Sequence, residues 1–310
     1  MKAAPPPKLK CPRAWCKADI PVGKITCVIC GCVAFGTPRS KEGQRPDDGV
    51  KRLSEIEALK VERILSGFAD RNWGPANDPG IAVCGITLLG GAPGAGKSTL
   101  CAQILSAISN VTGGNTLYVG SEENAEQVKA RAVRLGLQNL EQMLILPLEA
   151  QYAGYKVTRE LFERWKPRAW VLDSLQKYSE SDQDAVKMCE DMKEITVKYR
   201  CPSIIISQVN KEEEFSGLQG QMHAVDTLIS FTLAESIQAP NGRILTPPFD
   251  PENPDKMEPF RILKTTKNRD GDAYESYFTM HSNGLRPFHV PSHDEEGEEE
   301  EERFTKRRMQ

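Results

Sequence analysis

The sequence predicts an α/β fold built on a mostly parallel sheet. Short β-branched and apolar runs alternate with longer amphipathic segments over residues 48–285, the pattern of a parallel sheet covered by helices. A glycine-rich stretch, GGAPGAGKST, follows one apolar run and opens one amphipathic segment. The chain has 310 residues, 39% of them hydrophobic, which is enough for one sizeable core and a small satellite.

Seven apolar runs predict strands, and two longer segments predict helices. The predicted strands are GITLLGG, NTLYVGS, QMLILPL, AWVLDSL, PSIIISQ, DTLISFTL and FRILKTT. Apolar residues recur with helical spacing in KSTLCAQILSAISN and DAVKMCEDMKEITVKYR, which predict the two helices.

The first 47 residues differ in composition from the rest and are predicted to form a zinc-ribbon-like module with a linker. Five of the nine cysteines lie between residues 11 and 32. The cysteine count is odd and no secretion signal is present, so metal binding explains the cluster better than disulfides do. Two pairs ten residues apart can hold Zn²⁺ tetrahedrally, and the expected ligands are Cys11, Cys16, Cys27 and Cys30.

Residues 91–99 carry the strongest signal for function. Gly91-x4-Gly96-Lys97-Ser98 lies between a predicted strand and a predicted helix, the setting of a phosphate-binding P-loop. Glycines leave backbone N–H groups free to surround phosphate oxygens, and the helix N-terminus adds its positive end. We expect Lys97 to reach the β- and γ-phosphates of ATP and Ser98 to bind Mg²⁺. The expected cofactor-binding residues are Gly91, Ala92, Pro93, Gly94, Ala95, Gly96, Lys97, Ser98, Thr99 and Asp173.

Polar side chains end three more of the predicted strands. Asp173 ends AWVLD, where a carboxylate can order the magnesium ion's water shell, although such an Asp can also cap a helix. Glu122 follows LYVGS and is the expected base that polarises the attacking water, with Glu123 in reserve. Gln208, followed by Asn210, ends PSIIISQ at the same edge of the sheet. An amide there can hydrogen-bond the γ-phosphate, and the loss of this phosphate on hydrolysis can then change the conformation of the following loop.

Charge is segregated along the chain. The net charge is −3, yet residues 294–302 alone hold eight acidic residues, so we expect residues 286–310 to form a disordered tail, acidic and then basic. No apolar run approaches a membrane span and no signal peptide is present, which predicts a cytoplasmic protein without a membrane partner.

Six stretches occur in the order found in the RadA (Sms) family of RecA-like DNA repair ATPases. They are RLSEIEALKVERILSGFAD, LLGGAPGAGKSTL, LYVGSEENAEQVKARAVRLGL, VLDSLQ, HAVDTLISF and RILKTTKNRDG. The resemblance covers about residues 11–285 and implies a RecA-like ATPase domain, assigned to residues 48–285. It further implies a homo-oligomeric ring, which we expect to be a hexamer, that binds ATP between subunits and moves on single-stranded DNA.

The chain departs from the RadA pattern at three places. CPRAWC spaces the first cysteine pair by four residues where RadA-like proteins have two, so Cys32 is an alternative zinc ligand. The sequence stops near residue 310, which implies a shortened form without the Lon-protease-like domain of RadA. Glu212, Glu213 and Glu214 follow Gln208, in the loop that faces DNA in RecA-like proteins, and carboxylates are unfavourable beside phosphates.

The stretch KNRDG resembles the KNRFG motif of RadA, with Lys267, Asn268, Arg269 and Gly271 matching. The resemblance implies that Lys267 and Arg269 act on a neighbouring subunit's γ-phosphate, where a cation supplied in trans stabilises developing charge. The alternative is a structural one, because Asp270-Gly271 is also a hairpin turn signal.

Two functions follow from these patterns. The first is an ATP-hydrolysing motor or helicase on single-stranded DNA, serving recombination, repair or replication. The second is a KaiC-like ATPase switch that regulates a protein partner through the zinc module or the acidic tail. The expected catalytic residues are Glu122, Lys97, Gln208, Lys267 and Arg269.

Overall fold

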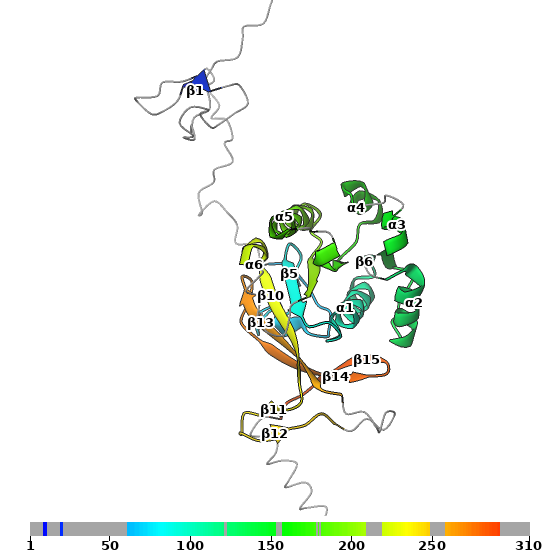
Figure 1. Ribbon diagram of the computed structural model, residues 1–310, viewed down its shortest axis with the longest axis vertical. Helices are drawn as coiled ribbons and strands as arrows, with labels where there is room; N and C mark the ends of the chain where they lie inside the picture. The colour runs from blue at the N-terminus through cyan, green and yellow to red at the C-terminus, as the bar shows by residue number, and fades with distance from the viewer. Residues whose placement is uncertain are drawn as a thin grey trace, which may run out of the picture. The chain divides into compact units, whose positions relative to one another are not determined.

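The computed structural model describes residues 61–120, 123–152, 157–177, 179, 181–208, 219–248 and 258–291, and the backbone of Leu9–Lys10 and Asp19–Ile20. The chain divides into two compact units, Met1–Leu59 and Lys60–Gln310. In the first unit, β1 (Leu9–Lys10) pairs antiparallel with β2 (Asp19–Ile20). The second unit carries the predicted α/β architecture (Figure 1).

One nine-stranded sheet forms the centre of the second unit. Six neighbouring strands are parallel, and three antiparallel strands extend the sheet at one side. In sheet order the strands are β15 (Gly284–Phe288), β14 (Glu275–His281), β13 (Phe260–Asn268), β10 (Thr227–Ala234), β5 (Ile86–Gly91), β9 (Ser203–Gln208), β8 (Trp170–Asp173), β6 (Thr116–Gly120) and β7 (Met143–Leu146). We call the side where the six parallel strands end the carboxyl edge, and the side where they begin the amino edge.

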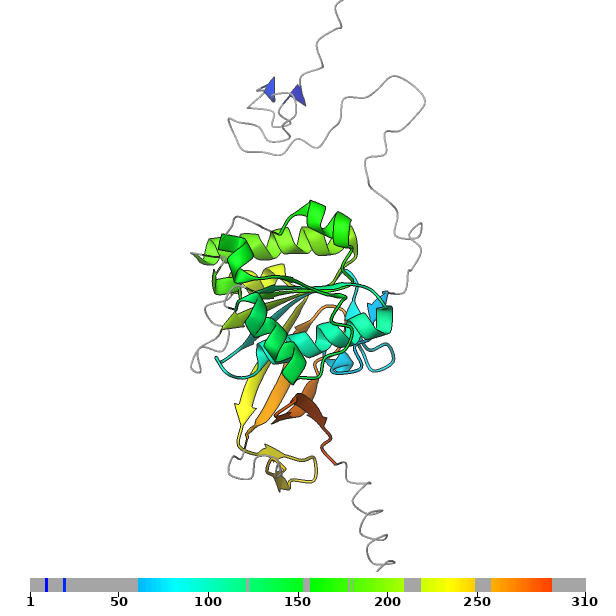
Figure 2. The ribbon, with the colours of Figure 1, turned by 90° about the vertical axis from the view of Figure 1, so that its right-hand side faces the viewer.

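Helices cover both faces of this sheet (Figure 2). One face is packed by α1 (Lys97–Thr112), and α2 (Ala125–Arg134) follows β6. The other face is packed by α4 (Arg159–Trp165) and α5 (Asp182–Tyr199). The remaining short elements are α3 (Leu148–Tyr152), α6 (Gln219–Ala224), 3-10 turns at Asp70–Asn72 and Leu175–Lys177, and two small ribbons, β3 (Arg63–Ile64) with β4 (Ile81–Ala82) and β11 (Ile237–Gln238) with β12 (Ile244–Leu245).

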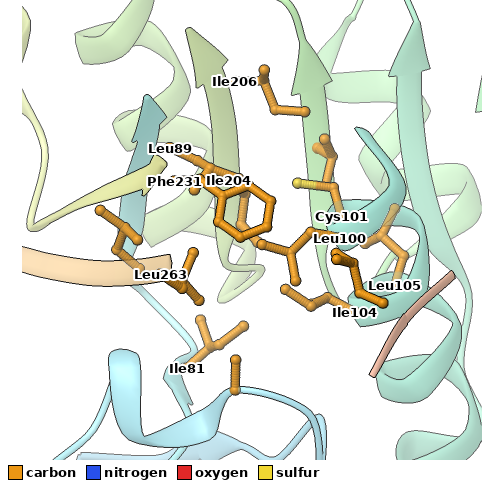
Figure 3. Packing of buried hydrophobic residues seen from close by; sticks show 14 of the residues in the cluster. Ile81, Leu89, Leu100, Cys101, Ile104, Leu105, Ile204, Ile206, Phe231 and Leu263 are labelled. Atoms are coloured by element: carbon orange, nitrogen blue, oxygen red, sulfur yellow. The ribbon is translucent and has the colours of Figure 1, made fainter. Parts of the chain in front are cut away.

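Alternation along the strands divides the core into two layers. Leu89 packs with the α1 side chains Leu100 and Ile104, whereas its neighbour Leu88 packs with residues of α4 and α5. Successive side chains of a strand point to opposite faces, so a continuous apolar run such as ITLL supplies both layers. Figure 3 shows the α1 layer, in which Phe231 of β10 and Leu263 of β13 belong to the same cluster as Leu100 and Ile104 of α1.

Local signals explain where the longer helices begin and end. In α2 the Asn124 side chain accepts from Gln127 N at 2.9 Å and the Gln127 side chain accepts from Asn124 N at 3.0 Å, a capping box. At the start of α5 the Ser181 hydroxyl accepts from Asp184 N at 3.2 Å, and Gly113 ends α1 with φ 63°. All seven predicted strands and both predicted helices are confirmed. Among the described residues, no helix is both long and apolar enough to cross a membrane.

Candidate nucleotide site at the carboxyl edge of the sheet

The P-loop joins β5 to α1, and its glycines are required by its geometry. A Cβ at Gly91 would lie 2.2 Å from the carbonyl oxygen of Phe231, a backbone atom of the adjacent strand that cannot give way. Gly96 has φ 102°, a conformation that favours glycine, and a Cβ there would lie 2.9 Å from Cε of Met280. The two glycines that frame the motif therefore fix how closely the loop approaches β10 and β14.

The N-terminus of α1 is prepared for an anion. No side chain caps it, and its first turn carries no acidic residue. The first N–H groups of a helix lack partners within the helix and form the positive end of its dipole. The surrounding residues thus fit a phosphate group better than a neutral ligand.

The Lys97 side chain is buried against the loop that precedes it. Its Nζ donates to the carbonyl oxygens of Gly91 at 2.7 Å and Ala92 at 2.9 Å. These bonds satisfy an ammonium group that would otherwise be buried without its hydration. They also hold the cation within the loop that phosphates would occupy.

The polar strand ends predicted from the sequence meet at the carboxyl edge. The sheet register pairs Gly91 of β5 with Gln208 of β9, and Gly120 of β6 with Asp173 of β8. Gln176 fastens this edge, because its Nε2 donates to Ser207 Oγ at 2.8 Å and to Gln208 O at 3.1 Å. The P-loop, Asp173 and Gln208 therefore line one edge, with Gly120 leading into residues 121–123.

A hydrogen-bonded chain connects Asp173 to Glu123. The Tyr118 hydroxyl donates to Asp173 Oδ2, and Arg131 Nη2 donates to the Tyr118 oxygen at 3.0 Å. Arg131 Nη1 also forms an ion pair with Glu123 Oε2 at 2.5 Å, with the Arg131 side chain 11% exposed. Burial, followed by the Asp173 carboxylate, raises the pKa of Tyr118 well above its usual range. Tyr118 therefore keeps its proton and orients Asp173 as a hydrogen-bond donor.

Lys267 and Arg269 lie at the opposite, amino edge of the sheet. Lys267 Nζ donates to the carbonyl oxygens of Met222 and Val225, the latter at 2.8 Å, at the end of α6. Arg269 Nη1 pairs with Asp226 Oδ1 at 2.9 Å, and Lys193 Nζ contacts the same oxygen at 2.7 Å. Burial, and then the nearby Arg269, lower the pKa of Lys267.

The register measures how far these cations are from the P-loop of their own chain. Lys267 pairs with Leu228, which pairs with Leu88, three residues before Gly91. Three residues along β5 and two strands across amount to about 14 Å from Gly91. The ammonium group also turns toward α6, away from the loop, so Lys267 does not share a site with Lys97 in one subunit.

Comparison with known proteins agrees with this arrangement. The family model for the KaiC ATPase matches residues 75–281, which include the P-loop, Asp173, Gln208 and Lys267. The chain belongs to the KaiC ATPase family. A KaiC-like protein from the archaeon Pyrococcus horikoshii OT3 has a similar fold, with a TM-score of 0.54 at 16% identity, over 74% of this chain and 100% of that one. The predicted RecA-like fold class is confirmed.

Two relatives of this KaiC-family chain carry the name DNA repair protein RadA. The protein from Aquifex aeolicus (strain VF5) is 30% identical over 249 residues, which are 77% of this chain and 49% of that protein. The protein from Streptococcus pneumoniae (strain ATCC BAA-255 / R6) is 29% identical over 243 residues, 76% of this chain and 51% of its own length. The resemblance to RadA is confirmed, and the chain spans about half the length of these relatives.

Several predicted residues lie outside the part of the chain that the structure describes. They are Glu122, Asn210, Glu212–Glu214 and the cysteines Cys11, Cys16, Cys27, Cys30 and Cys32. Within the described residues, no group of three or more His, Cys, Asp or Glu side chains is arranged to hold a metal ion. The zinc site and the roles of these residues therefore stay predictions.

Sequence reasoning missed Tyr118 and Arg131 in this KaiC-family site. Tyr118 reads as one apolar residue of a buried strand, and Arg131 as one cation of a solvated helix face. One signal was present in the spacing along the strand. Alternate residues of a strand face the same side of the sheet, so Tyr118 faces the same side as the residue that ends its strand. Only the pairing of β6 with β8 brings its hydroxyl to Asp173.

Proposed function

We propose that the chain is a RecA-type ATP hydrolase that acts on single-stranded DNA as a ring, in DNA repair, recombination or replication. One observation carries the ring hypothesis: Lys97 and Lys267 belong to opposite edges of the same sheet. If both act on one nucleotide, they must come from two subunits. The DNA part of the proposal rests on the relatives named DNA repair protein RadA.

Within one subunit we assign the roles by chemistry. When bound, ATP with Mg²⁺ supplies the phosphoryl group to be transferred and partial neutralisation of its charge. Lys97 exchanges its two loop carbonyls for phosphate oxygens. The Ser98 hydroxyl binds Mg²⁺, and Asp173 orders the water shell of the ion. Asp173 is kept in position by Tyr118, which Arg131 holds in turn. Glu122 takes a proton from the attacking water, and Gln208 contacts the γ-phosphate.

Between subunits we assign Lys267 and Arg269 to the neighbour's γ-phosphate. Both cations have flexible side chains and exchangeable partners, namely two carbonyl oxygens for Lys267 and a shared carboxylate for Arg269. A cation supplied in trans can accelerate phosphoryl transfer by about 10³-fold or more. Hydrolysis then depends on assembly.

Mixed rings test this proposal. The Lys267→Ala and Glu122→Gln variants are each expected to bind ATP and to be inactive alone. In a mixture, some interfaces pair an intact Glu122 with an intact Lys267 from the next subunit, and those interfaces should hydrolyse ATP. Activity that rises with protein concentration supports the assignment. A mixture as inactive as its components, with mixed assembly shown by mass spectrometry, would overturn it.

A second candidate function is a KaiC-like switch that regulates a protein partner. It is favoured by Glu212–Glu214, because three carboxylates after Gln208 oppose contact with a phosphate backbone. The rate of ATP hydrolysis with and without single-stranded DNA discriminates the two. A motor should be stimulated, and the stimulation should weaken with salt, whereas a switch should respond to neither.

We also propose Zn²⁺ as a structural cofactor of the N-terminal segment, held by Cys11, Cys16, Cys27 and Cys30 with Cys32 as the alternative ligand. The support is the paired spacing of the thiols in the sequence. The metal content of the purified chain, measured by mass spectrometry, should approach one zinc per chain and fall in the Cys27→Ser variant. An equal zinc content in both would remove Cys27 from the ligands.

A further inference from the structure

The stretch that carries Lys267 and Arg269 extends beyond the strand beside it. β14 begins at Glu275, opposite Lys264 of β13, although β13 continues for four more residues. The end of β13 and its connection to β14, residues 266–273, therefore lie past the first residue of β14. We call residues 266–273 the cation turn, because they include Lys267 and Arg269. Contacts other than a β14 ladder must hold this turn on the side away from β10.

Arg63 of β3 supplies one of these contacts from the start of the second unit. Its Nη2 donates to the carbonyl oxygen of Asp270, the residue that follows Arg269. The rest of the guanidinium group is bonded within its own segment, since Nη1 donates to the carbonyl oxygen of Gly80 at 3.1 Å and Nε lies 3.4 Å from Asp78 Oδ2. The Arg63 side chain is 6% exposed, so water competes little for these bonds.

The segment that follows β3 contacts the cation turn at two further points. Asn268 Nδ2 donates to the carbonyl oxygen of Trp73 at 3.1 Å. A Cβ at Gly271 would lie 2.9 Å from the carbonyl carbon of Gly74, so the turn lies directly against that backbone. Trp73 is itself buried, and its indole nitrogen donates to Thr87 Oγ1 of β5 at 2.8 Å. The turn is therefore tied to the strand that leads into the P-loop.

These contacts fix the backbone of the turn and leave the two charged groups free to exchange partners. Asn268 and Asp270, which flank Arg269, are the residues bonded to the segment. The Lys267 ammonium group is bonded to carbonyl oxygens of α6 and the Arg269 guanidinium group to a shared carboxylate, and phosphate oxygens can replace both. A misplacement of about 1 Å can reduce a reaction rate by about 10². Accurate placement of these cations therefore depends on the backbone.

We propose that Arg63 is a positioning residue that holds the cation turn where Lys267 and Arg269 reach the γ-phosphate of a neighbouring subunit. The inference rests on the trans role proposed above for these two cations. Arg63 acts through the carbonyl oxygen of Asp270 and touches no reacting atom. Arginine suits this task because its planar fork donates in several fixed directions at once, which the ammonium group of a lysine does not.

Two variants displace the turn without changing either cation. Arg63→Lys keeps the positive charge beside Asp78 and loses the fork, and Gly271→Ala adds a methyl group against the backbone of Gly74. Each should lower the kcat of ATP hydrolysis about tenfold, because the cations of the turn are misplaced. The ATP affinity measured by calorimetry should stay unchanged, because the P-loop is intact.

Ser276→Ala is the matched control. The Ser276 hydroxyl donates to Asn72 Oδ1 of the same segment at 2.6 Å, but Ser276 belongs to β14 and not to the turn. Its kcat should change by less than about twofold. Equal losses of kcat in the control and in the two variants, at equal free energies of unfolding, would overturn the proposal. So would an unchanged kcat in both variants beside the expected loss in Lys267→Ala, and that result would leave the trans role of Lys267 standing.

Mixed rings separate misplaced cations from damage to a subunit's own nucleotide site. A Gly271→Ala subunit keeps its P-loop, so it should hydrolyse ATP at the normal rate wherever a Glu122→Gln subunit supplies the cations. The activity of the mixture should then exceed the sum of its components severalfold. No gain, with mixed assembly shown by mass spectrometry, would contradict the positioning role. Full hydrolysis by Lys267→Ala alone would instead refute the trans role first, and Arg63 would have no catalytic cation to position.

Discussion

The carboxyl edge and the amino edge of the central sheet carry complementary sets of groups. The carboxyl edge holds the P-loop with Lys97, and Asp173 and Gln208 on the neighbouring strand ends. The amino edge holds Lys267 and Arg269, which are bonded to α6 and to Asp226. The comparison teaches that one subunit holds these two sets of cations at opposite ends of its own strands. If both sets act on one nucleotide, as we propose, they come from two subunits.

The largest effect is expected at the carboxyl edge. Lys97→Ala removes the cation that faces the phosphates, and we expect ATP affinity to fall about 50-fold, since hydrogen bonds to charged groups are worth about 1.5–3 kcal/mol. Glu122→Gln should keep ATP affinity and lose turnover, because it removes a base and not a phosphate ligand. Nucleotide titration calorimetry and steady-state hydrolysis measure the two. Equal losses of affinity would contradict the division of roles.

The next effect sharpens the comparison at the amino edge. Lys267→Ala should leave ATP affinity unchanged and reduce hydrolysis by about 10³-fold. Lys193→Ala is the matched control, because Lys193 shares Asp226 with Arg269 but belongs to α5. If Lys193→Ala lost as much activity as Lys267→Ala, the network around Asp226 would be structural. KNRDG would then be a structural hairpin turn without a role in hydrolysis.

A smaller effect concerns the positioning of Asp173. Tyr118→Phe removes the hydroxyl that donates to Asp173 and leaves the ring in the core. The loss of one hydrogen bond, about 1 kcal/mol, should raise the Mg²⁺ concentration needed for half-maximal hydrolysis roughly fivefold. The KM for ATP at saturating Mg²⁺ should stay unchanged. An equal rise in both constants would indicate general loosening of the site instead.

The smallest effect is expected on β13 itself. Lys264 pairs with Glu275 at 3.3 Å, and its side chain is 59% exposed. Exposed ion pairs contribute about 0–1 kcal/mol, so Lys264→Ala should change the free energy of unfolding by less than about 0.5 kcal/mol and leave hydrolysis unchanged. Denaturant titration and the hydrolysis rate check this. A loss of activity near that of Lys267→Ala would mean that any cation of this strand matters.

Sequence patterns were sufficient where one residue type has one physical use. Gly91 and Gly96 could be recognised because only glycine allows the close approach and the positive φ of the P-loop. The strands of the parallel core could be recognised because strands buried on both faces are continuous apolar runs. The short strands β11 and β12, and the helix α4 with seven residues, have too little periodicity to be predicted.

The sequence by itself determined the phosphate-binding loop and the α/β class, because both depend on local conformation and on contacts between residues close in the chain. The resemblance to RadA was also visible in the sequence, because its motifs are stretches of consecutive residues. Only the tertiary structure decided that Tyr118 and Arg131 join Asp173 to Glu123, and that Lys267 faces away from Lys97. The physical reason is strand order. Pairing of β6 with β8, and of β10 with both β5 and β13, sets which distant residues become neighbours, and no local pattern encodes that pairing.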